Sequence, residues 1–377
     1  MKKTELRLGI IGLGLMGREV VSAVARQCHL LDCQARPVIA GICNLDPVTN
    51  EWFVENFGTG MMITDDYKVL LADPSIDAIY CAVPHHLHNQ FYCDIIASGK
   101  HLLGEKPFGV DLAANEEITR MAEAHPEVLV RCSSEFPFFP AVQEIGKMWE
   151  AGVFGDIIEI NGSFQHSSDC DRNKPINWKR MAKFNGEYGC LGDLGLHVCH
   201  MPFKCGIKPL NVRAILSKIV KERPDGKGGM APCDAWDNGT LFIEGEWNGQ
   251  RFPWTMKMQR LAPGEKNSWN FEIIGMDCSV RFSSRDPNAL QLCRDNHWVR
   301  CEIEHKPAYP TITGKIFEFG FSDSMLQMVA AFAEECVIGK PRSRFAGCLN
   351  VHEAALSHKL FTAALQSAKE GKVISLQ

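Results

Sequence analysis

Residues 6–132 alternate short apolar runs with amphipathic stretches, and this alternation constrains the fold more than any other feature of the sequence. The strand-like runs are LRLGIIG, RPVIAGIC, AIYCAVP, KHLLGEK and EVLVRC. Stretches such as REVVSAVARQCHLL and AANEEITRMAEAH lie between them and have the periodicity of helices. Strands and helices in alternation predict a parallel sheet with helices on both faces, which is an α/β domain.

The first strand-like run leads directly into GLGLMG, which contains Gly12, Gly14 and Gly17. Gly12 permits a tight turn, Gly14 lets the backbone approach a pyrophosphate, and Gly17 lets the following helix pack close to the strand. Free N–H groups at the start of that helix attract phosphates. Because a strand precedes the glycines and a helix follows them, we predict a dinucleotide site rather than a structural turn alone.

The segment CNLDP, after the second strand-like run, bears on the choice between NAD and NADP. Asn44 stands where an acidic residue would bind the ribose, and its amide can hydrogen-bond two hydroxyls without a charge. No Arg or Lys lies between Gly41 and Thr59 to meet a 2′-phosphate. We therefore expect NAD, with NADP as the alternative if Arg18 brings a cation near the phosphates.

Two later strand-like runs end in AVPHHLH and GEKPFGVD. Ligands of such sheets bind outside the carboxyl ends of the strands, so these two segments should border the ligand site. Three histidines within four residues point to a site more strongly than a single histidine does. Lys106, flanked by Glu105 and Pro107, is expected to face the ligand rather than solvent.

Composition and charge exclude several classes of protein. The net charge of -5 and the lack of a long basic run argue against a nucleic-acid surface. No apolar segment approaches the roughly 18–20 residues of a membrane span. Sixteen cysteines without a paired CxxC motif predict buried free thiols in a reducing cytoplasm. Cys190, Cys199, His200 and Cys205 match no zinc spacing, so no metal is expected.

Together these motifs resemble those of the glucose-fructose oxidoreductase, inositol dehydrogenase and rhizopine-catabolism family (Gfo/Idh/MocA). GIIGLGLMGRE is similar to the family's opening, AVPHHLH with GKHLLGEKP to its central signature, and GDLGLH to its Asp-x-x-x-His signature. The resemblance runs nearly end to end. It implies an N-terminal Rossmann domain at residues 1–132 and a substrate and oligomerisation domain at residues 133–377, built on a large, mostly antiparallel open sheet.

The pattern after residue 133 agrees with this division. Longer strand-like runs appear, including GDIIEINGSFQ, NVRAILSKIV, GTLFIEGEW and NFEIIGMDCSVRF, and two helical stretches close the chain. Few helices are left to cover both faces of such a sheet. We expect an uncovered apolar face that pairs with another copy, giving a homodimer or homotetramer.

The resemblance assigns Lys106, Asp193 and His197 to catalysis. Oxidising an alcohol sends a hydride to the nicotinamide, and the protein must accept the hydroxyl proton. His197 suits a general base because the ordinary pKa of histidine is ~6.5. Lys106 would stabilise alkoxide character on the oxygen. Asp193, one helical turn before His197, would hydrogen-bond the substrate or orient the imidazole. The alternative is that Asp193 caps a helix and His197 is packed in a core.

The glycines of the GEYGCLGDLG stretch are expected to leave room for the ligand. The residues expected to bind the cofactor are Gly12, Gly14, Met16, Gly17, Asn44, Pro84, His85, His88, Glu105 and Lys106. The residues expected to bind the substrate are Lys106, Trp178, Asp193 and His197.

Two segments narrow the resemblance. Many members carry an arginine in a YRFxP-like segment, whereas this chain has SSEFPFFP, with Glu135 and Pro137 near that position. Substrate contacts from that segment are therefore not carried over. NWKRMAKFNGEYGCLGDLGLH is similar to a segment of members that oxidise sugars and anhydrosugars. Trp178 would offer an apolar face to a sugar or nicotinamide ring, or would be a core tryptophan.

The resemblance implies an NAD-dependent dehydrogenase that oxidises a secondary ring hydroxyl of a sugar, glycoside or anhydrosugar, at C3, with C1 as the rival position. A cyclitol (inositol) dehydrogenase is an alternative. Another is a glycoside-cleaving enzyme that passes through a 3-keto sugar with bound NAD. A non-catalytic dinucleotide sensor is disfavoured, because a sensor needs no proton acceptor. The expected partner is a small sugar or cyclitol, with neither nucleic acid nor membrane.

Overall fold

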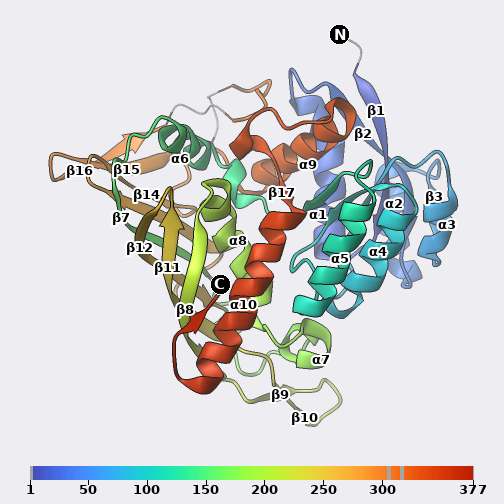
Figure 1. Ribbon diagram of the computed structural model, residues 1–377. Coiled ribbons are helices and arrows are strands. Elements are labelled where there is room, and N and C mark those ends of the chain that lie inside the picture. The colour runs from blue at the N-terminus through green and yellow to red at the C-terminus, as the bar shows by residue number, and fades with distance from the viewer. Residues whose placement is uncertain (1–2, 304–306, 315–317, 377) are drawn as a thin grey trace.

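The computed structural model describes residues 3–303, 307–314 and 318–376, which form two sheets and a small two-stranded ribbon (Figure 1). The N-terminal sheet has the strand order β17-β6-β5-β4-β1-β2-β3. Strands β1 to β6 are parallel and β17 is antiparallel to β6. Their bounds are β1 (Thr4–Ile11), β2 (Ala35–Cys43), β3 (Met62–Thr64), β4 (Ala78–Cys81), β5 (His101–Gly104), β6 (Val130–Cys132) and β17 (Leu349–Asn350).

Helices cover both faces of this sheet, as the alternating pattern predicts. They are α1 (Leu15–Ala25), α2 (Pro47–Phe57), α3 (Tyr67–Ala72), α4 (His88–Ala97) and α5 (Leu112–Ala124). Leu8 of β1 packs in one core with Val21 of α1, while Ile79 of β4 packs on the opposite face with Ile95 of α4. The five predicted strands are confirmed. β3 escaped prediction because its three residues are too few to show a period.

Helix α9 (Phe321–Ile338) returns from the C-terminal part of the chain to the N-terminal sheet. Its Met325, Val329 and Phe332 share one buried core with Leu8 and Val21. The structure thus adds a late helix, as well as β17, to the first sheet. The boundary between residues 132 and 133 stays a prediction from the sequence.

The second sheet has the order β16-β15-β14-β13-β7-β12-β11-β8-β18, and every neighbouring pair is antiparallel except β7 with β12. This confirms the predicted large, mostly antiparallel sheet. The strands are β7 (Ile157–Gln165), β8 (Lys208–Ser217), β11 (Asn238–Trp247), β12 (Gln250–Gln259), β13 (Ser268–Gly275), β14 (Ser279–Ser283), β15 (Ala289–Arg294), β16 (His297–Glu302) and β18 (Ile374–Ser375). The ribbon pairs β9 (Glu222–Pro224) with β10 (Met230–Pro232).

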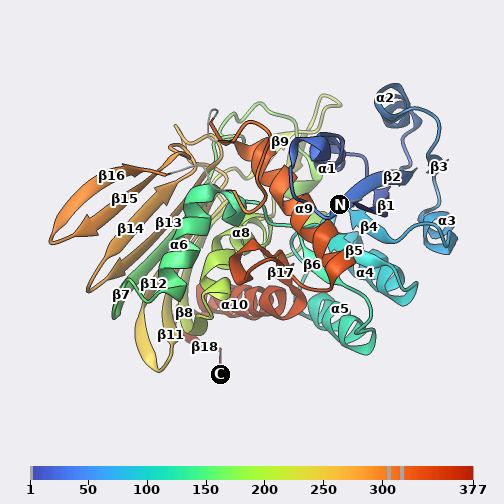
Figure 2. The same ribbon diagram turned by 90° about the horizontal axis from the view of Figure 1, so that it is seen from above.

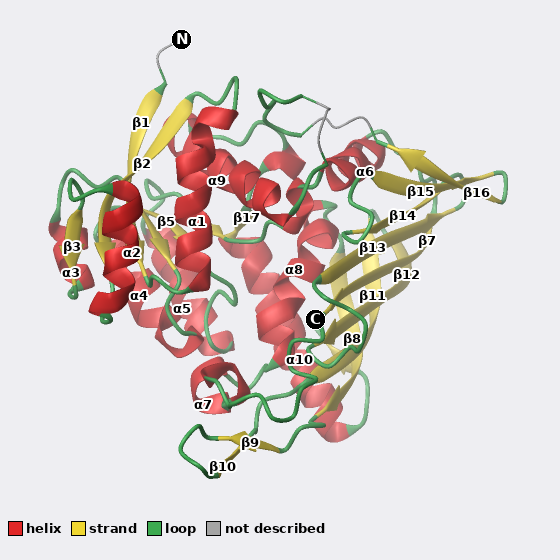
Figure 3. Ribbon diagram, turned by 180° about the vertical axis from the view of Figure 1, so that it is seen from behind, coloured by secondary structure: helices red, strands yellow, loops and turns green. Residues whose placement is uncertain are grey.

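The remaining helices are α6 (Pro140–Glu150), α7 (Ala182–Asn185), α8 (Cys190–Lys204) and α10 (Val351–Glu370). Figures 2 and 3 show α6, α8 and α10 on the side of the second sheet that faces the first domain. Within the described chain, no helix covers the opposite side in these views. No helix of the described residues is long and apolar enough to cross a bilayer.

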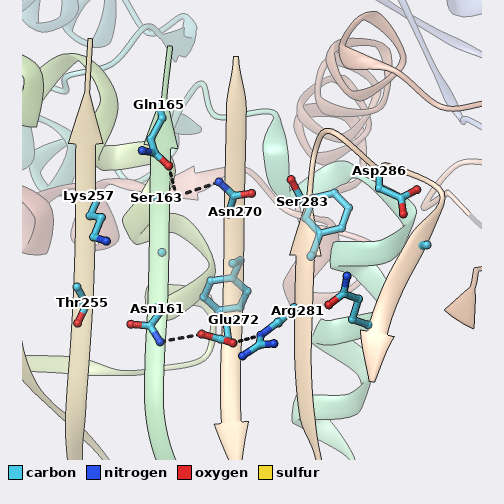
Figure 4. Close-up of a pocket in the computed structure, with 15 residues that line it drawn as sticks. Asn161, Ser163, Gln165, Thr255, Lys257, Asn270, Glu272, Arg281, Ser283 and Asp286 are labelled. Atoms are coloured by element: carbon cyan, nitrogen blue, oxygen red, sulfur yellow. Dashed lines mark hydrogen bonds and ion pairs between the residues drawn. The ribbon is translucent and has the colours of Figure 1, made fainter. Parts of the chain in front are cut away.

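The open face of the second sheet is polar around a hollow of about 500 Å³ (Figure 4). Asn161 of β7 donates to Glu272 of β13 at 2.8 Å, and Asn270 donates to Ser163 at 3.0 Å. The expectation of an apolar face is wrong here. Alternation along β7 sends Ile160 and Phe164 into the core and turns the polar side chains between them outward.

Candidate functional site

A cavity of about 1200 Å³ lies between the two sheets and holds most of the predicted site. Its N-terminal wall is formed by segments that directly follow β1, β2, β3, β4, β5 and β6. Its other wall comes from β7, α8, the end of β12 and the short 3₁₀ turn at Trp178–Arg180. The predicted residues that line it are Gly12, Gly14, Met16, Asn44, Pro84, His85, Glu105, Lys106, Trp178, Asp193 and His197.

The glycine loop has the shape that a pyrophosphate needs. Gly12 has a φ of 88°, and a Cβ there would lie 2.6 Å from the carbonyl oxygen of Ala82. Gly14 is the N-cap of α1, makes no side-chain cap hydrogen bond, and would point a Cβ into open space. Gly17 packs against the carbonyl of Gly12 and does not line the cavity. The free N–H groups of α1 and the space beside Gly14 therefore fit a dinucleotide.

Carboxylates line the cavity next to the ends of β2 and β3, and none of the described residues that line it directly after these two strands is a cation. Asn44, after β2, lines it together with Asp65 and Asp66, after β3. Arg18, which would have favoured NADP, is exposed and does not line the cavity. Sequence reasoning missed the two aspartates because it did not recognise β3. A negative wall here opposes a 2′-phosphate.

The two predicted histidines of the AVPHHLH segment have different environments. His85 lines the cavity, and its ring contacts Trp178 edge-on with centroids 4.7 Å apart. His88 is buried away from the cavity. Its Nδ1 lies 2.7 Å from the carbonyl oxygen of Pro107 and its Nε2 lies 2.9 Å from that of Val83. His88 therefore links the loop after β4 to the loop after β5 and does not line the cavity.

Glu105 and Lys106 follow β5 and are held by different partners. The Glu105 carboxylate accepts a hydrogen bond from Tyr80 Oη at 2.8 Å, and its carbonyl accepts one from Tyr92 Oη at 2.6 Å. Lys106 Nζ lies 3.0 Å from Asp193 Oδ1 and 2.5 Å from the Asp193 carbonyl oxygen. Burial lowers the pKa of Lys106 from its ordinary value. Lys106 is thus a desolvated cation fixed against α8.

Three cations converge on the buried carboxylate of Asp193. Besides Lys106, Lys179 Nζ lies 2.9 Å from Oδ1, and the Arg260 guanidinium contacts Oδ2. Arg260 also pairs with Asp169 at 3.0 Å. Burial alone would raise the pKa of Asp169, but Arg260 and then Arg180 hold it well below its usual range. Sequence reasoning missed Arg260, which lies at the end of β12 and belongs to no motif.

His197 is buried on α8, four residues after Asp193, with its Nδ1 directed at the segment that follows β6. Nδ1 lies 3.0 Å from Ser134 Oγ and 3.9 Å from Glu135 Oε2. The ring makes edge contacts with Phe136 and Phe164. Ser134, and not Asp193, is therefore the hydrogen-bond partner that orients the imidazole. Burial, and then Lys106 and Lys179, hold the pKa of His197 well below its ordinary value, so the ring is neutral at neutral pH.

The expectation that the glycines around α8 leave room for a ligand is wrong. A Cβ on Gly195 would lie 2.6 Å from the ring of Phe361, and one on Gly189 would lie 2.5 Å from the amide nitrogen of Trp236. Gly189 also has a φ of 56°. Protein atoms fill the space that each missing side chain leaves. These glycines therefore pack α8 against α10 and the segment before β11.

Within the described residues, no group of three or more His, Cys, Asp or Glu side chains could hold a metal ion. What the cavity does combine is a cradle for a dinucleotide, a neutral imidazole that can accept a proton, and a cation that can stabilise a developing alkoxide. These are the components that dehydrogenation of an alcohol requires.

Comparison with known proteins agrees with this chemistry. Residues 6–132 match the model of an oxidoreductase family with an NAD-binding Rossmann fold. Levoglucosan dehydrogenase of Pseudarthrobacter phenanthrenivorans is 27% identical over 303 residues, 76% of this chain and 76% of that protein. Glucose-6-phosphate 3-dehydrogenase of Bacillus subtilis is 27% identical over 302 residues, 79% of this chain and 80% of that protein.

A solved structure of levoglucosan dehydrogenase in complex with NADH and levoglucosan has a TM-score of 0.86 to this fold. It is 23% identical in sequence, and the match covers 99% of this chain and 100% of that chain. Residues 6–132 thus belong to the Gfo/Idh/MocA family of oxidoreductases, and rhizopine catabolism protein MocA of Rhizobium meliloti is 27% identical over 257 residues, 66% of this chain and 73% of that protein.

Proposed function

We propose that this enzyme oxidises a secondary ring hydroxyl of a sugar, glycoside or anhydrosugar, at C3, with NAD as the acceptor. The observation that carries the proposal is that Lys106 and His197 line one cavity together with the glycine loop, and that the charge of Lys106 acts on the pKa of His197. A hydroxyl bound between them would touch a base and a cation at once.

The reaction divides between the cofactor and the side chains of this chain. Bound NAD supplies the acceptor for the hydride. His197 accepts the hydroxyl proton, because the low pKa of its buried ring keeps it neutral. Lys106 stabilises the negative charge that develops on the oxygen, and Asp193 holds Lys106 in place. Trp178, half-buried at the cavity, presents an aromatic face for the apolar side of a sugar ring.

The relatives support a ring carbon other than C1. Levoglucosan, the anhydrosugar named for one relative, has no free anomeric hydroxyl, so a dehydrogenase acting on it cannot form a lactone at C1. The other relative is named for oxidation at position 3 of glucose 6-phosphate. Hydroxyls at C2 and C4 flank a C3 carbinol and offer hydrogen-bond partners to Asp193 and Lys106, which would fix the hydrogen that leaves.

A substrate panel tests the proposal. Glucose, glucose 6-phosphate, methyl glucoside, levoglucosan and myo-inositol would each be offered with NAD, and the nicotinamide absorbance followed. We expect turnover of the methyl glucoside or levoglucosan, with a ketone as product. Turnover of free sugars alone, with a lactone as product, would move the reaction to C1. Turnover of myo-inositol alone would identify a cyclitol dehydrogenase. Glycoside cleavage without net NADH, by enzyme that co-purifies with NAD, would identify the transient-oxidation alternative.

We also propose that the enzyme is a homodimer or homotetramer that uses the open face of the second sheet. Interfaces between subunits need not be more apolar than the rest of the surface, and a polar face with a few exposed apolar side chains is compatible with one. Phe242 on β11 and Ile215 on β8 are such side chains. Light scattering that returned the 42.1 kDa mass of one chain at micromolar concentration would contradict this.

A further inference from the structure

Glu135 is a buried carboxylate that the family resemblance assigns no role. It follows β6, is 3% exposed, and lines the same cavity as Lys106 and His197. Its Oε2 lies 3.9 Å from Nδ1 of His197, which is within ion-pair distance. A carboxylate buried this deeply is rarely retained without a partner. The partner that the geometry offers is the imidazole of His197.

The ring of His197 has one protein side and one cavity side. On the protein side, Nδ1 faces Ser134 Oγ at 3.0 Å and Glu135 beyond it. Phe136 and Phe164 hold the ring edge-on, so it has little freedom to turn. Nε2 is the nitrogen left for the hydroxyl proton of a substrate. This assignment requires Nδ1 to carry the hydrogen before the reaction, because a neutral imidazole has one donor and one acceptor.

The surroundings of His197 strongly favour its neutral form, so another group must stabilise the ring when it accepts a proton. Burial, Lys106 and Lys179 all oppose a positive charge on the ring. A base that gains a proton under these conditions needs a negative charge nearby. The Glu135 carboxylate, 3.9 Å from Nδ1, supplies this charge and favours the Nδ1–H tautomer.

We propose that Glu135 is a positioning residue whose negative charge favours the Nδ1–H tautomer of His197 and stabilises the imidazolium that forms during catalysis, an inference that rests on the function proposed above. The O–H bond of the substrate breaks and its proton binds Nε2. The Nδ1–H bond stays intact, with Ser134 Oγ at 3.0 Å and the Glu135 carboxylate at 3.9 Å. The electron pair left on the substrate oxygen forms the carbonyl as the hydride leaves for the nicotinamide. The products of this step on the protein are a positively charged His197 and an ionised Glu135 beside it.

Four titratable groups from the surrounding elements act on Glu135. They are Tyr80 on β4, Glu105 and Lys106 after β5, and His197 on α8. Burial, and then Glu105, raise the pKa of Glu135 to about 7, while Lys106 acts in the opposite direction. Below this pH the carboxyl holds a proton and has no negative charge with which to stabilise the imidazolium. Oxidation should therefore increase as the pH rises through about 7.

The test compares Glu135→Gln with wild type and with Glu144→Gln, a control on α6 whose carboxylate is 45% exposed. Glutamine keeps the shape of Glu135, but its amide can donate to Nδ1 and favour the opposite tautomer. We expect about 10- to 100-fold lower turnover in Glu135→Gln, loss of the acid limb from the pH profile, and unchanged NAD affinity. The control should match wild type in all three. A wild-type pH profile and turnover in Glu135→Gln would overturn the proposal.

A second readout needs no substrate. Nitrogen NMR of histidine-labelled protein, with His197→Ala to assign the signal, reports which ring nitrogen carries the hydrogen. We expect Nδ1–H in wild type above pH 7 and a shift toward Nε2–H in Glu135→Gln; an unchanged tautomer would count against the proposal. If wild type oxidises no sugar, the proposed function fails, while this comparison still decides the role of Glu135.

Should Glu135→Gln fail to fold, as judged by circular dichroism, Glu135→Asp takes its place. Aspartate keeps the charge but is shorter, so turnover should fall while the acid limb remains. An acid limb that disappears in Glu135→Asp would overturn the proposal, because the charge would then not be its origin.

Discussion

Replacing Asp193 with asparagine should destabilise the protein, because its buried carboxylate contacts Lys106, Lys179 and Arg260 together. Its side chain is 2% exposed, and those of Arg260 and Lys106 are 5% and 13% exposed. Asparagine fits the same space without a charge, and its amide group presents donors to groups that are themselves donors. Asp193→Asn therefore leaves buried positive charge without its counter-charge.

The size of the loss follows from what each cation retains. Removing one partner of a buried ion pair costs about 3–5 kcal/mol. Arg260 keeps Asp169 at 3.0 Å, and Lys106 keeps the main-chain oxygen of residue 193 at 2.5 Å. Lys179 is 34% exposed and can regain water. We therefore expect a loss of about 2–4 kcal/mol in the free energy of unfolding.

Chemical denaturation, followed by tryptophan fluorescence and circular dichroism, measures this loss. The matched control is Asp286→Asn, which breaks a surface pair with Arg300 in which the aspartate is 48% exposed; it should cost less than about 1 kcal/mol. Adding Lys179→Met to Asp193→Asn should restore part of the stability, because one uncompensated charge is removed. If Asp193→Asn were as stable as the surface control, the three cations would not depend on Asp193 and the reasoning would be refuted.

Three further predictions concern the base, the cofactor and the pH dependence of stability. His197→Ala should lower turnover about 10²–10⁴-fold while NAD still binds, and near-normal rates across the pH range would exclude His197 as the base. In binding titrations, NAD should have a higher affinity than NADP, and Asp65→Lys should make the two affinities more similar. Equal affinities of wild type for NAD and NADP would contradict the proposal that Asp65 and Asp66 disfavour a 2′-phosphate. Because the pKa of Glu135 is raised from 4.5 to about 7, the unfolded chain binds fewer protons between these values. The free energy of unfolding of wild type should therefore fall by up to about 3 kcal/mol relative to that of Glu135→Gln as the pH rises from 4.5 to 7. Denaturation at several pH values measures this change. If the difference in unfolding free energy between the two proteins did not vary with pH, Glu135 would ionise with its ordinary pKa.

The sequence alone was sufficient for the parallel sheet of the N-terminal domain and for the residues whose role depends on local geometry, while the large antiparallel sheet was implied by the family resemblance. Period and turn residues are local properties, so the alternation up to residue 132 predicted the parallel sheet, and Gly12, Gly14 and Gly17 predicted the turn into α1. Lys106 was found from its place after a strand. Asp193 and His197 were identified through the resemblance of GDLGLH to a family signature, because a spacing of four on one helical face alone also fits a helix cap and a packed histidine.

The tertiary structure alone decided which atoms meet across long distances in the chain. Arg260 reaches Asp193 only because β12 ends beside α8, and Glu135 reaches His197 only because β6 ends there too. The structure also shows that His88 binds a main-chain carbonyl and that Phe361 fills the space beside Gly195. The local sequence around either residue would fit a ligand site equally well. Buried polar and charged groups pair with the residues that tertiary packing brings close to them. That packing depends on the whole chain and not on local sequence.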